Sequence, residues 1–307
     1  MPTLRQLDYL VAIAETRHFR RAAQRCNTSQ STLSVQLKAL EERLGVDLVE
    51  RAKSPVELTA VGLEVVKVAR RMLCDAQAIR DFANSHQGLR AGAVTLAIPP
   101  TLAPSLLTRV IPLMRRAFPS KTLKVLERSP QELADRLIEG DCDVIIAQLP
   151  LRAENIQIVE IFEEPLYLTL ANGHPLASNT AVRWDDLHDV EVLALGPEHQ
   201  LHDEIVSQCA QSGVRLQTDF AGASLESIST MVASGLGVSF LPALYLRDKL
   251  LSHACLQSRP IQGHRFSRTI GMAWRQAGAH RSQFKQLADE LRADVTAQLQ
   301  NDKVQKN

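Results

Sequence analysis

The chain has 307 residues, 45% hydrophobic and 22% charged, which suits two or three folded domains and excludes a disordered polymer. Its apolar runs are shorter than the roughly 20 residues that a membrane-spanning helix needs, and charged residues interrupt the N-terminal ones, so we expect neither a membrane span nor a signal peptide. The net charge is +1, with +4 on residues 1–90 and −3 on the remainder, a difference too small to select a partner.

The number and spacing of the cysteines and histidines argue against disulfide bonds and metal sites. The five cysteines are scattered without a CxxC pair, and their number is odd. Such usage argues against a disulfide-stapled secreted domain and against a tetracysteine zinc site. His199 and His202 are close enough to share a metal, but no third ligand is near in sequence, so solvated histidines are the simpler interpretation. We expect a cytoplasmic protein with no metal, no cofactor and no catalytic residues.

Residues 1–58 show the pattern of a small helical domain. Helical spacing of apolar residues predicts a first helix around residues 7–14 and a second over 19–26. Ser29 is a suitable N-cap for a third helix, which Gly45 would end. That helix carries an apolar stripe formed by Leu33, Leu37, Leu40 and Leu44. Two short strands, at residues 47–50 and 56–58, would follow it around a turn.

A long helix is predicted over residues 60–85, with Thr59 as its cap, and we assign residues 59–90 to a linker and dimerisation helix. Its apolar residues are spaced 4, 3, 4, 3 and 4, namely Val65, Ala69, Met72, Ala76, Ile79 and Ala83. A heptad seam of this kind favours pairing with another helix. The alternative is a helix that rests on its own domain, but a helix of roughly 39 Å has little to rest on there.

Residues 91–307 alternate between strand and helix patterns. The first set comprises strands at 94–98, 123–127 and 143–147 with helices at 104–118 and 130–139; the second comprises strands at 192–195, 218–220 and 237–241 with helices at 199–212 and 225–233. This order predicts two Rossmann-like α/β lobes with parallel sheets and a ligand in the crevice beyond the strand ends. A late strand at 269–274 and a helix at 281–300 would return to the first lobe.

The most informative stretch is the turn between the second and third helices. Residues 17–25 hold four arginines and one histidine without an acid, and the third helix would expose Gln30, Ser31, Ser34 and Lys38. Glutamine can pair with adenine in the major groove, while serine and lysine reach phosphates or bases. The pattern predicts a helix-turn-helix, with Arg51 and Lys53 on a wing. A polar helix face is by itself usually only solvated.

Over residues 3–295 the chain resembles the LysR-type transcriptional regulators. The matching segments are residues 7–10 (LDYL), 22–23 (AA), 29–34 (SQSTLS), 40–45 (LEERLG), Arg51 and 58–62 (LTAVG). The resemblance implies a winged helix-turn-helix, a dimerising linker helix, and an effector domain of two α/β lobes like type 2 periplasmic binding proteins. It also implies a tetramer built from two dimers, a two-half-site operator in double-stranded DNA, and RNA polymerase as a partner.

Within that family the chain is most similar to the peroxide-responsive, OxyR-type activators. The similarity is carried by residues 17–23 (RHFRRAA), 223–227 (ASLES), 241–244 (LPAL) and 268–271 (RTIG). Those activators sense peroxide with a cysteine that follows a histidine, and a second cysteine nine residues later resolves it. Here His199 is present, Gln200 occupies the first cysteine position, and Cys209 occupies the second. An amide cannot replace a nucleophilic thiolate, so the resemblance predicts a regulator that has lost this thiol switch.

These arguments select two sets of site residues. For DNA binding they are Arg20, Arg21, Ser29, Gln30, Ser31, Thr32, Ser34, Gln36, Arg51 and Lys53. For a small-molecule effector between the lobes, the resemblance to the peroxide-sensing site implies Thr101, His199, Gln200 and Arg268, and also Pro130, which stands where that site has a threonine. Ser224 is added because it precedes a predicted helix, and Cys209 is a redox candidate. Thr101 and Ser224 could equally be plain helix caps.

Three other functions remain as alternatives. A peroxide sensor could use Cys209 with a different cysteine, a solute-binding protein could use the same two lobes, and a thiol peroxidase could use a catalytic cysteine. The solute-binding protein would need a signal peptide or a lipid anchor, and Gln200 argues against the peroxidase.

Overall fold

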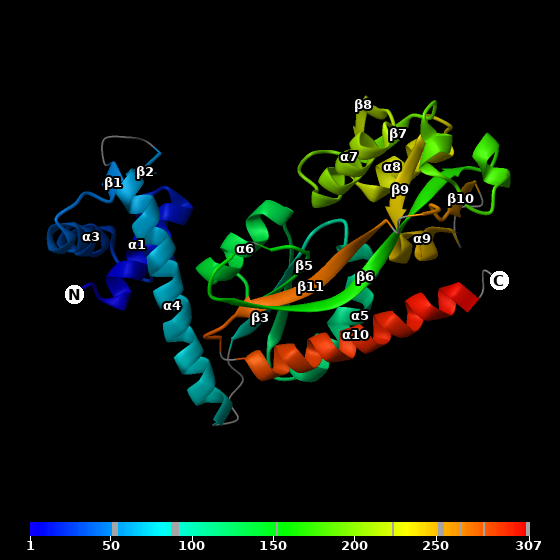
Figure 1. Ribbon diagram of the computed structural model, residues 1–307. Coiled ribbons are helices and arrows are strands. Elements are labelled where there is room, and N and C mark those ends of the chain that lie inside the picture. Colours follow the sequence, from blue (N-terminus) through cyan, green and yellow to red (C-terminus); the bar gives the residue numbers. More distant parts are fainter. Residues whose placement is uncertain are drawn as a thin grey trace. The chain divides into compact units, whose positions relative to one another are not determined.

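The computed structural model describes residues 1–50, 55–86, 92–151, 153–222, 224–250, 255–263, 266–278 and 280–304. The chain divides into two compact units, one built on Met1–Gly92 and the other on most of the remainder (Figure 1). The two wing residues predicted to meet DNA, Arg51 and Lys53, lie outside the described residues. So does the predicted domain boundary between residues 90 and 91.

The N-terminal unit is a helical head followed by a long helix. Its elements are α1 (Leu4–Thr16), α2 (Phe19–Arg25), α3 (Gln30–Leu44), β1 (Val49–Glu50), β2 (Glu57–Leu58) and α4 (Ala60–His86). The helix ends follow local sequence signals. Thr3 and Gln6 form a capping box at α1, and the Ser29 hydroxyl accepts from the Thr32 amide at α3. Gly45 ends α3 in the left-handed conformation, with φ of 71°.

Small residues set the close contacts of the head. Ala22 and Ala23 on α2 are buried, which lets α2 cross the neighbouring helices closely. Gly62, in the first turn of α4, lies against Leu48, the residue before β1. A Cβ atom at this glycine would stand 2.0 Å from the Leu48 carbonyl oxygen, so no larger residue fits without a shift of the backbone.

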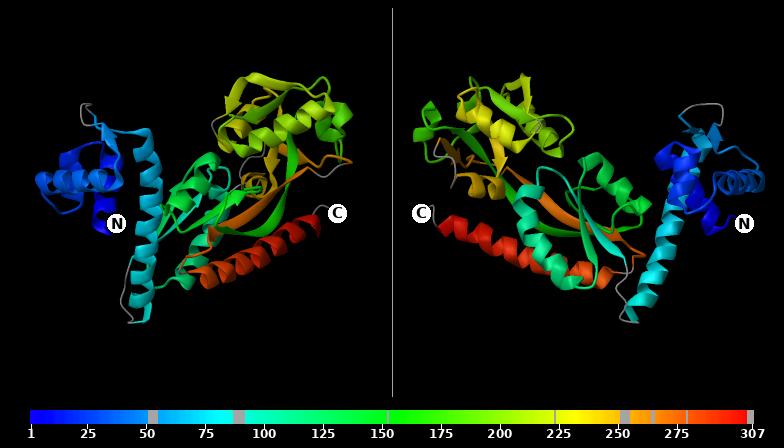
Figure 2. Two further views of the ribbon diagram at one scale, coloured as in Figure 1. Left: turned by 60° about the vertical axis from the view of Figure 1, so that its left-hand side comes forward. Right: turned by 180° about the vertical axis from the view of Figure 1, so that it is seen from behind.

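The long helix α4 uses part of its predicted dimer seam to pack on its own head. Its first half packs on the head, where Val66 and Ala69 are 4% and 1% exposed and belong to the head's core; both views of Figure 2 show the helix continuing beyond the head. The prediction that Ala69 faces a partner helix is therefore wrong. The large apolar residues that α4 leaves exposed include Leu63 and four residues spaced by 7, 4 and 7, namely Val61, Val68, Met72 and Ile79.

The C-terminal unit is built on one mixed sheet. Its strands are β3 (Ala93–Ile98), β4 (Thr122–Glu127), β5 (Val144–Gln148), β6 (Ile156–Ala171), β7 (Val192–Leu195), β8 (Leu216–Gly222), β9 (Val238–Pro242), β10 (Leu256–Arg259) and β11 (Ser267–Arg275). Among the described residues the strands run in the order β4-β3-β5-β11-β6-β9-β7-β8, and β10 pairs with β6. The predicted parallel pairs β3–β4, β3–β5, β7–β8 and β7–β9 are present.

The parallel pairing predicted from the strand–helix alternation covers only part of the sheet, because β6 and β11 join antiparallel to their neighbours. The strand β6 was not predicted; it has 16 residues and passes through both lobes. The first half of β6 pairs with β11, and the second half pairs with β9 and β10. One strand therefore connects the two lobes directly.

Helices cover this sheet and complete two separate cores. They are α5 (Ala103–Ala117), α6 (Pro130–Glu139), α7 (Gln200–Ser212), α8 (Leu225–Ala233), α9 (Ala243–Leu250) and α10 (Arg281–Val304), with 3-10 turns η1 (Pro175–Ser178) and η2 (Trp184–Leu187). As predicted, the C-terminal segment returns to the first lobe: β11 and α10 share its core, and α10 lies along β6 beside α5 (Figure 1). In the described part of the chain, no helix combines the length and apolar character that crossing a membrane requires.

Candidate functional site

The helix α3 has two sharply different faces. Leu33, Leu37 and Leu40 are each 0% exposed and fix the buried face. On the outward face Gln30, Ser31, Thr32 and Lys38 are exposed, while Ser34 and Gln36 are half-buried at its edges. Since α3 follows the tight turn after α2, the head presents a polar helix in the manner of a helix-turn-helix.

The first turn of α3 carries a short hydroxyl network. The Ser29 hydroxyl lies 2.9 Å from the Ser31 hydroxyl and 2.8 Å from the Thr32 hydroxyl, and it accepts from the Thr32 amide at 3.1 Å. Ser29 therefore orders the N-terminus of the helix. The positive end of the helix dipole and the exposed hydroxyl groups at this position suit a phosphate.

Two residues of α1 support the polar face from the side. The Gln6 side-chain amide donates to the Gln36 carboxamide oxygen at 3.2 Å, which holds that side chain in place. Arg5 donates from Nε to the Tyr9 hydroxyl at 2.8 Å, and its guanidinium lies 5.8 Å from the Tyr9 ring centre. Arg5 and Tyr9 line a hollow of about 380 Å³ with Thr3, Thr32 and Gln36. Arg5 was not predicted as a site residue, because its place beside α3 depends on the packing of α1.

The basic segment before α3 divides into paired and available cations. Arg25 forms an ion pair with Glu15 of α1, so it is neutralised within the head. Arg20 and Arg21 are exposed and form no ion pair with another described residue. The acid-free run in the sequence therefore overstates the charge available to an anionic partner.

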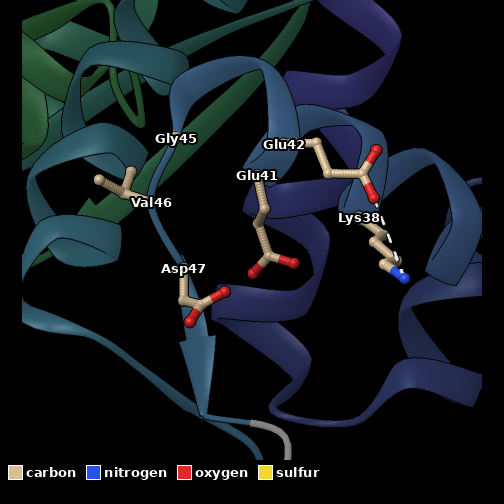
Figure 3. A pocket seen from close by; sticks show the side chains of 6 residues that line it. All are labelled: Lys38, Glu41, Glu42, Gly45, Val46 and Asp47. Atoms are coloured by element: carbon tan, nitrogen blue, oxygen red, sulfur yellow. Dashed lines mark ion pairs between the residues drawn. The ribbon is translucent and has the colours of Figure 1, made fainter.

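Glu41 ties the end of α3 to the wing strand. Its side chain is 6% exposed, and one carboxylate oxygen accepts from the amides of Leu48 and Val49 at 2.9 and 3.3 Å. Figure 3 shows Glu41 turned toward the segment that leads into β1, while Lys38 and Glu42, 3.9 Å apart, point outward. Glu41 also lines a surface hollow with Glu42 and Asp47. Because the Glu41 carboxylate is already hydrogen-bonded to backbone amides, it holds the segment before β1 in place and is not available to a ligand.

In the C-terminal unit, Arg268 forms a buried cluster with Thr101 and with Glu164, a residue the sequence analysis did not select. Arg268 is 2% exposed and Glu164 1% exposed, and they lie opposite each other on β11 and β6. Arg268 donates to one Glu164 oxygen from Nε at 2.9 Å and from a terminal nitrogen at 2.8 Å. The other Glu164 oxygen accepts from the Leu244 amide in the first turn of α9.

Thr101 completes this cluster. Arg268 donates to the Thr101 hydroxyl at 3.5 Å and to its carbonyl at 3.4 Å. The interpretation of Thr101 as a plain N-cap is wrong, because α5 begins at Ala103 with Leu102 in the cap position and no side-chain cap. The cluster joins β3, β6, β11 and α9 where the two lobes meet, and its charges cancel.

A second group lies at the N-terminus of α7. His199 is the cap residue and 5% exposed; its Nδ1 atom has no hydrogen-bond partner among the described residues, and its Nε2 atom lies 3.5 Å from a Glu198 oxygen. Gln200 opens the helix and is half-buried. One turn later Glu204 accepts a hydrogen bond from the Gln148 side chain of β5 at 3.2 Å, which links the two lobes.

The remaining predicted effector residues have local roles. Ser224 caps α8, because its hydroxyl accepts from the Ser227 amide at 3.1 Å. Pro130 is the first residue of α6. Among the described residues, no hydrogen bond or ion pair connects Pro130, His199, Gln200 or Ser224 to the Arg268–Thr101 pair. The structure joins two of the six predicted residues directly.

Cys209 is buried in the core of the second lobe and 1% exposed. Burial raises the pKa of its thiol to about 11, so the group is protonated near neutral pH. None of the five cysteines, all of which lie among the described residues, forms a disulfide. A protonated, enclosed thiol is a poor nucleophile toward peroxide.

A helix-turn-helix head with a long helix, attached to a two-lobed α/β unit, defines a ligand-regulated DNA-binding protein. Comparison with known proteins agrees. Residues 4–63 match the lysR-family bacterial regulatory helix-turn-helix, and residues 87–296 match the LysR substrate binding domain. The chain belongs to the LysR family of transcriptional regulators, which are not enzymes.

Several relatives extend over nearly the whole chain. It is 35% identical over 295 residues to the DNA-binding transcriptional dual regulator OxyR of Escherichia coli K12, covering 94% of this chain and 95% of that protein. It is 33% identical to the HTH-type transcriptional regulator EstR of Acinetobacter baylyi, and the match covers 97% of this chain and 99% of that protein. A full-length OxyR variant from Pseudomonas aeruginosa superposes with a TM-score of 0.80, 35% identity and 94% coverage of each chain. The fold is that of an OxyR-like regulator.

Proposed function

We propose that the protein is an OxyR-like transcriptional activator of the cytoplasm that has exchanged thiol-based peroxide sensing for a bound small molecule. The observation that carries the DNA-binding part is the outward face of α3, which is polar while the opposite face is fully buried. Ser29, Gln30, Ser31, Thr32, Ser34 and Gln36 would meet the DNA in or beside the major groove. Arg5, Arg20 and Arg21 would neutralise phosphates, together with Arg51 and Lys53, which lie outside the described residues.

The exposed stripe Val61, Val68, Met72 and Ile79 supports dimerisation through α4. Its spacing is that of a coiled-coil seam, and the four side chains are between 46% and 72% exposed in the single chain. A dimer would present two heads to two half-sites of one operator, and two dimers would form a tetramer. The predicted division into residues 1–58, 59–90 and 91–307 is part of this proposal, and so is RNA polymerase as a partner.

The two groups at the lobe junction support the effector site. Arg268 and Thr101 belong to segments that meet where β6 passes between the lobes, and His199 and Gln200 open α7 of the second lobe. Because Glu164 already neutralises Arg268, we expect a small neutral or weakly charged effector rather than a polyanion.

The case against a thiol switch rests on Gln200 and on the enclosed Cys209. A hydrogen peroxide-bound OxyR mutant of Corynebacterium glutamicum is 28% identical to this chain, with a TM-score of 0.63. Hydrogen peroxide is nevertheless not the signal we propose for this chain. A peroxide-driven disulfide between Cys209 and another cysteine is the second candidate.

DNA binding by the full chain tests the first part. Arg21→Ala should weaken binding to all sequences alike and reduce the slope of log Kd against log salt by about 1. Arg183→Ala, an exposed arginine of the C-terminal unit, is the matched control and should leave the slope unchanged. An unchanged slope in Arg21→Ala would reject the proposed phosphate contact.

Dimerisation and sensing need separate measurements. Met72→Glu places a charge in the proposed seam and should shift the sedimentation coefficient toward the monomer, whereas Lys67→Glu on the neighbouring exposed face should not. Peroxide should leave the free-thiol count and the DNA footprint unchanged. A disulfide at Cys209 accompanied by a footprint shift would establish the second candidate instead.

A further inference from the structure

One residue on the outward face of α3 does not fit its polar surroundings. Val35 is 64% exposed, compared with 38% for Leu44 at the end of the same helix. It stands one turn after Ser31 and one turn before Lys38, and its neighbours Ser34 and Gln36 flank it. The buried face is occupied by Leu33 and Leu37, so the helix cannot rotate to bury Val35 within the head.

Helix stability does not explain a valine at this position. A β-branched residue restricts its own χ1 angle in a helix and is a weaker helix former than alanine or lysine. An exposed valine also gains nothing from packing, since burial is what stabilises an apolar side chain. Its two methyl groups instead form an apolar spot in the middle of a face whose other members donate or accept hydrogen bonds.

The neighbouring side chains leave this spot accessible to a flat surface. Ser31 and Ser34 are short, so they do not overtop the valine methyls. Lys38 is held toward Glu42 by an ion pair of 3.9 Å along the helix, which draws its ammonium group away from Val35. The apolar spot is therefore small, central and unshielded.

In the major groove, a methyl group at C5 distinguishes a T·A pair from the other unmodified base pairs. An apolar side chain that contacts this methyl reads thymine, because it gains little from the polar edge of any other base. We propose that Val35 is a specificity-determining residue that contacts a thymine C5-methyl group in each half-site. This inference rests on the proposed insertion of α3 into the major groove, and it adds a base that the polar residues do not specify.

The test combines a protein change with removal of the methyl group from the DNA. A duplex is first selected from a random library by the full-length wild-type chain, and uracil then replaces each thymine in turn. At one thymine per half-site, uracil should weaken wild-type binding roughly 3- to 10-fold. For Val35→Ala the same replacement should change Kd less than about 2-fold, and Val35→Thr, which keeps one methyl, should show an intermediate effect.

Val46→Ala is the matched control, because Val46 is an exposed valine of the same head that lies beyond the end of α3. It should retain the full sensitivity to uracil. The inference is overturned if Val35→Ala keeps the wild-type sensitivity, if no thymine in the selected site is sensitive, or if the selected half-site contains no thymine.

These outcomes differ from failure of the proposed function. If α3 does not enter the major groove, Gln30→Ala would also leave base preference unchanged, or selection with the wild-type chain would yield no preferred sequence. Sensitivity to Gln30→Ala combined with insensitivity to Val35→Ala would reject only the role of Val35. Circular dichroism should show that Val35→Ala retains the wild-type helix content, since the side chain is exposed.

Discussion

The outward face of α3 and the buried cluster around Arg268 carry out their proposed roles by opposite physical means. The α3 face comes from one helix, is exposed, and has polar groups that water satisfies in the free protein. The cluster draws Thr101, Glu164 and Arg268 from three distant segments, and the ion pair is almost fully enclosed. Substitutions on the first should therefore alter binding without altering stability, whereas substitutions in the second should alter stability first.

Breaking the buried ion pair should give the largest effect. Arg268→Ala leaves the Glu164 carboxylate enclosed without its cation, and the free energy of unfolding of the full chain should fall by about 3–5 kcal/mol. Urea denaturation measures it. Adding Glu164→Gln to Arg268→Met should recover part of the loss, since glutamine can still accept from the Leu244 amide.

The control for that prediction is an exposed pair. Arg183→Ala removes the partner of Asp185, whose side chain is 75% exposed, and should change the free energy of unfolding by no more than about 0.5 kcal/mol. Equal effects in Arg268→Ala and Arg183→Ala would mean that the cluster is open to water.

The N-terminal head also contains a close buried contact, between Gly62 and Leu48, that can be compared with the Arg268 cluster. Gly62→Ala would place a Cβ atom 2.0 Å from the Leu48 carbonyl oxygen, so the head should lose roughly 2–4 kcal/mol of stability and show a lower Tm. Gly173→Ala, where nothing lies within 4 Å, should leave Tm almost unchanged. A Gly62→Ala variant of wild-type stability would show that α4 can move away from β1.

Gln30→Ala tests the exposed face directly. Base preference at one operator position should relax at a cost of about 1–3 kcal/mol of discrimination, because glutamine can form a bidentate pair with adenine. The free energy of unfolding should change by less than about 0.5 kcal/mol, since the side chain is exposed. Competition binding and urea denaturation of the same preparation measure the two quantities. A loss of stability as large as the loss of discrimination would contradict the separation of roles.

Of these variants, Cys209→Ser should have the smallest effect on DNA binding, and its effect on stability should depend on pH. Its folded-state pKa of about 11 is above that of an unfolded thiol, about 8.5, so the folded state holds this proton more tightly. Its contribution to stability is thus complete below about pH 8.5 and is lost as pH rises through 11. Denaturation across pH 8–11 should show a shallower decline for Cys209→Ser than for wild type. Identical declines would mean that the thiol is not enclosed.

The regular elements of both units were largely predictable because they depend on local signals. As predicted, α3 begins after Ser29 and ends at Gly45. The strand–helix alternation predicted the positions of β3 to β5 and β7 to β9 within a few residues. The strand β6 was not predicted, because its charged residues 160, 163 and 164 interrupt the apolar pattern. Its pairing with β11 made the sheet mixed rather than parallel.

The sequence by itself determined the class of the protein, through the helix-turn-helix pattern and its family motifs, and it placed glutamine rather than cysteine at residue 200. Only the tertiary structure decided which side chains are available. It paired Arg25 with Glu15, buried Ala69 against the head, and enclosed Arg268 with Glu164. Each of these contacts joins residues from different elements. Burial and charge pairing depend on which elements pack together, and spacing along one helix or strand cannot specify that.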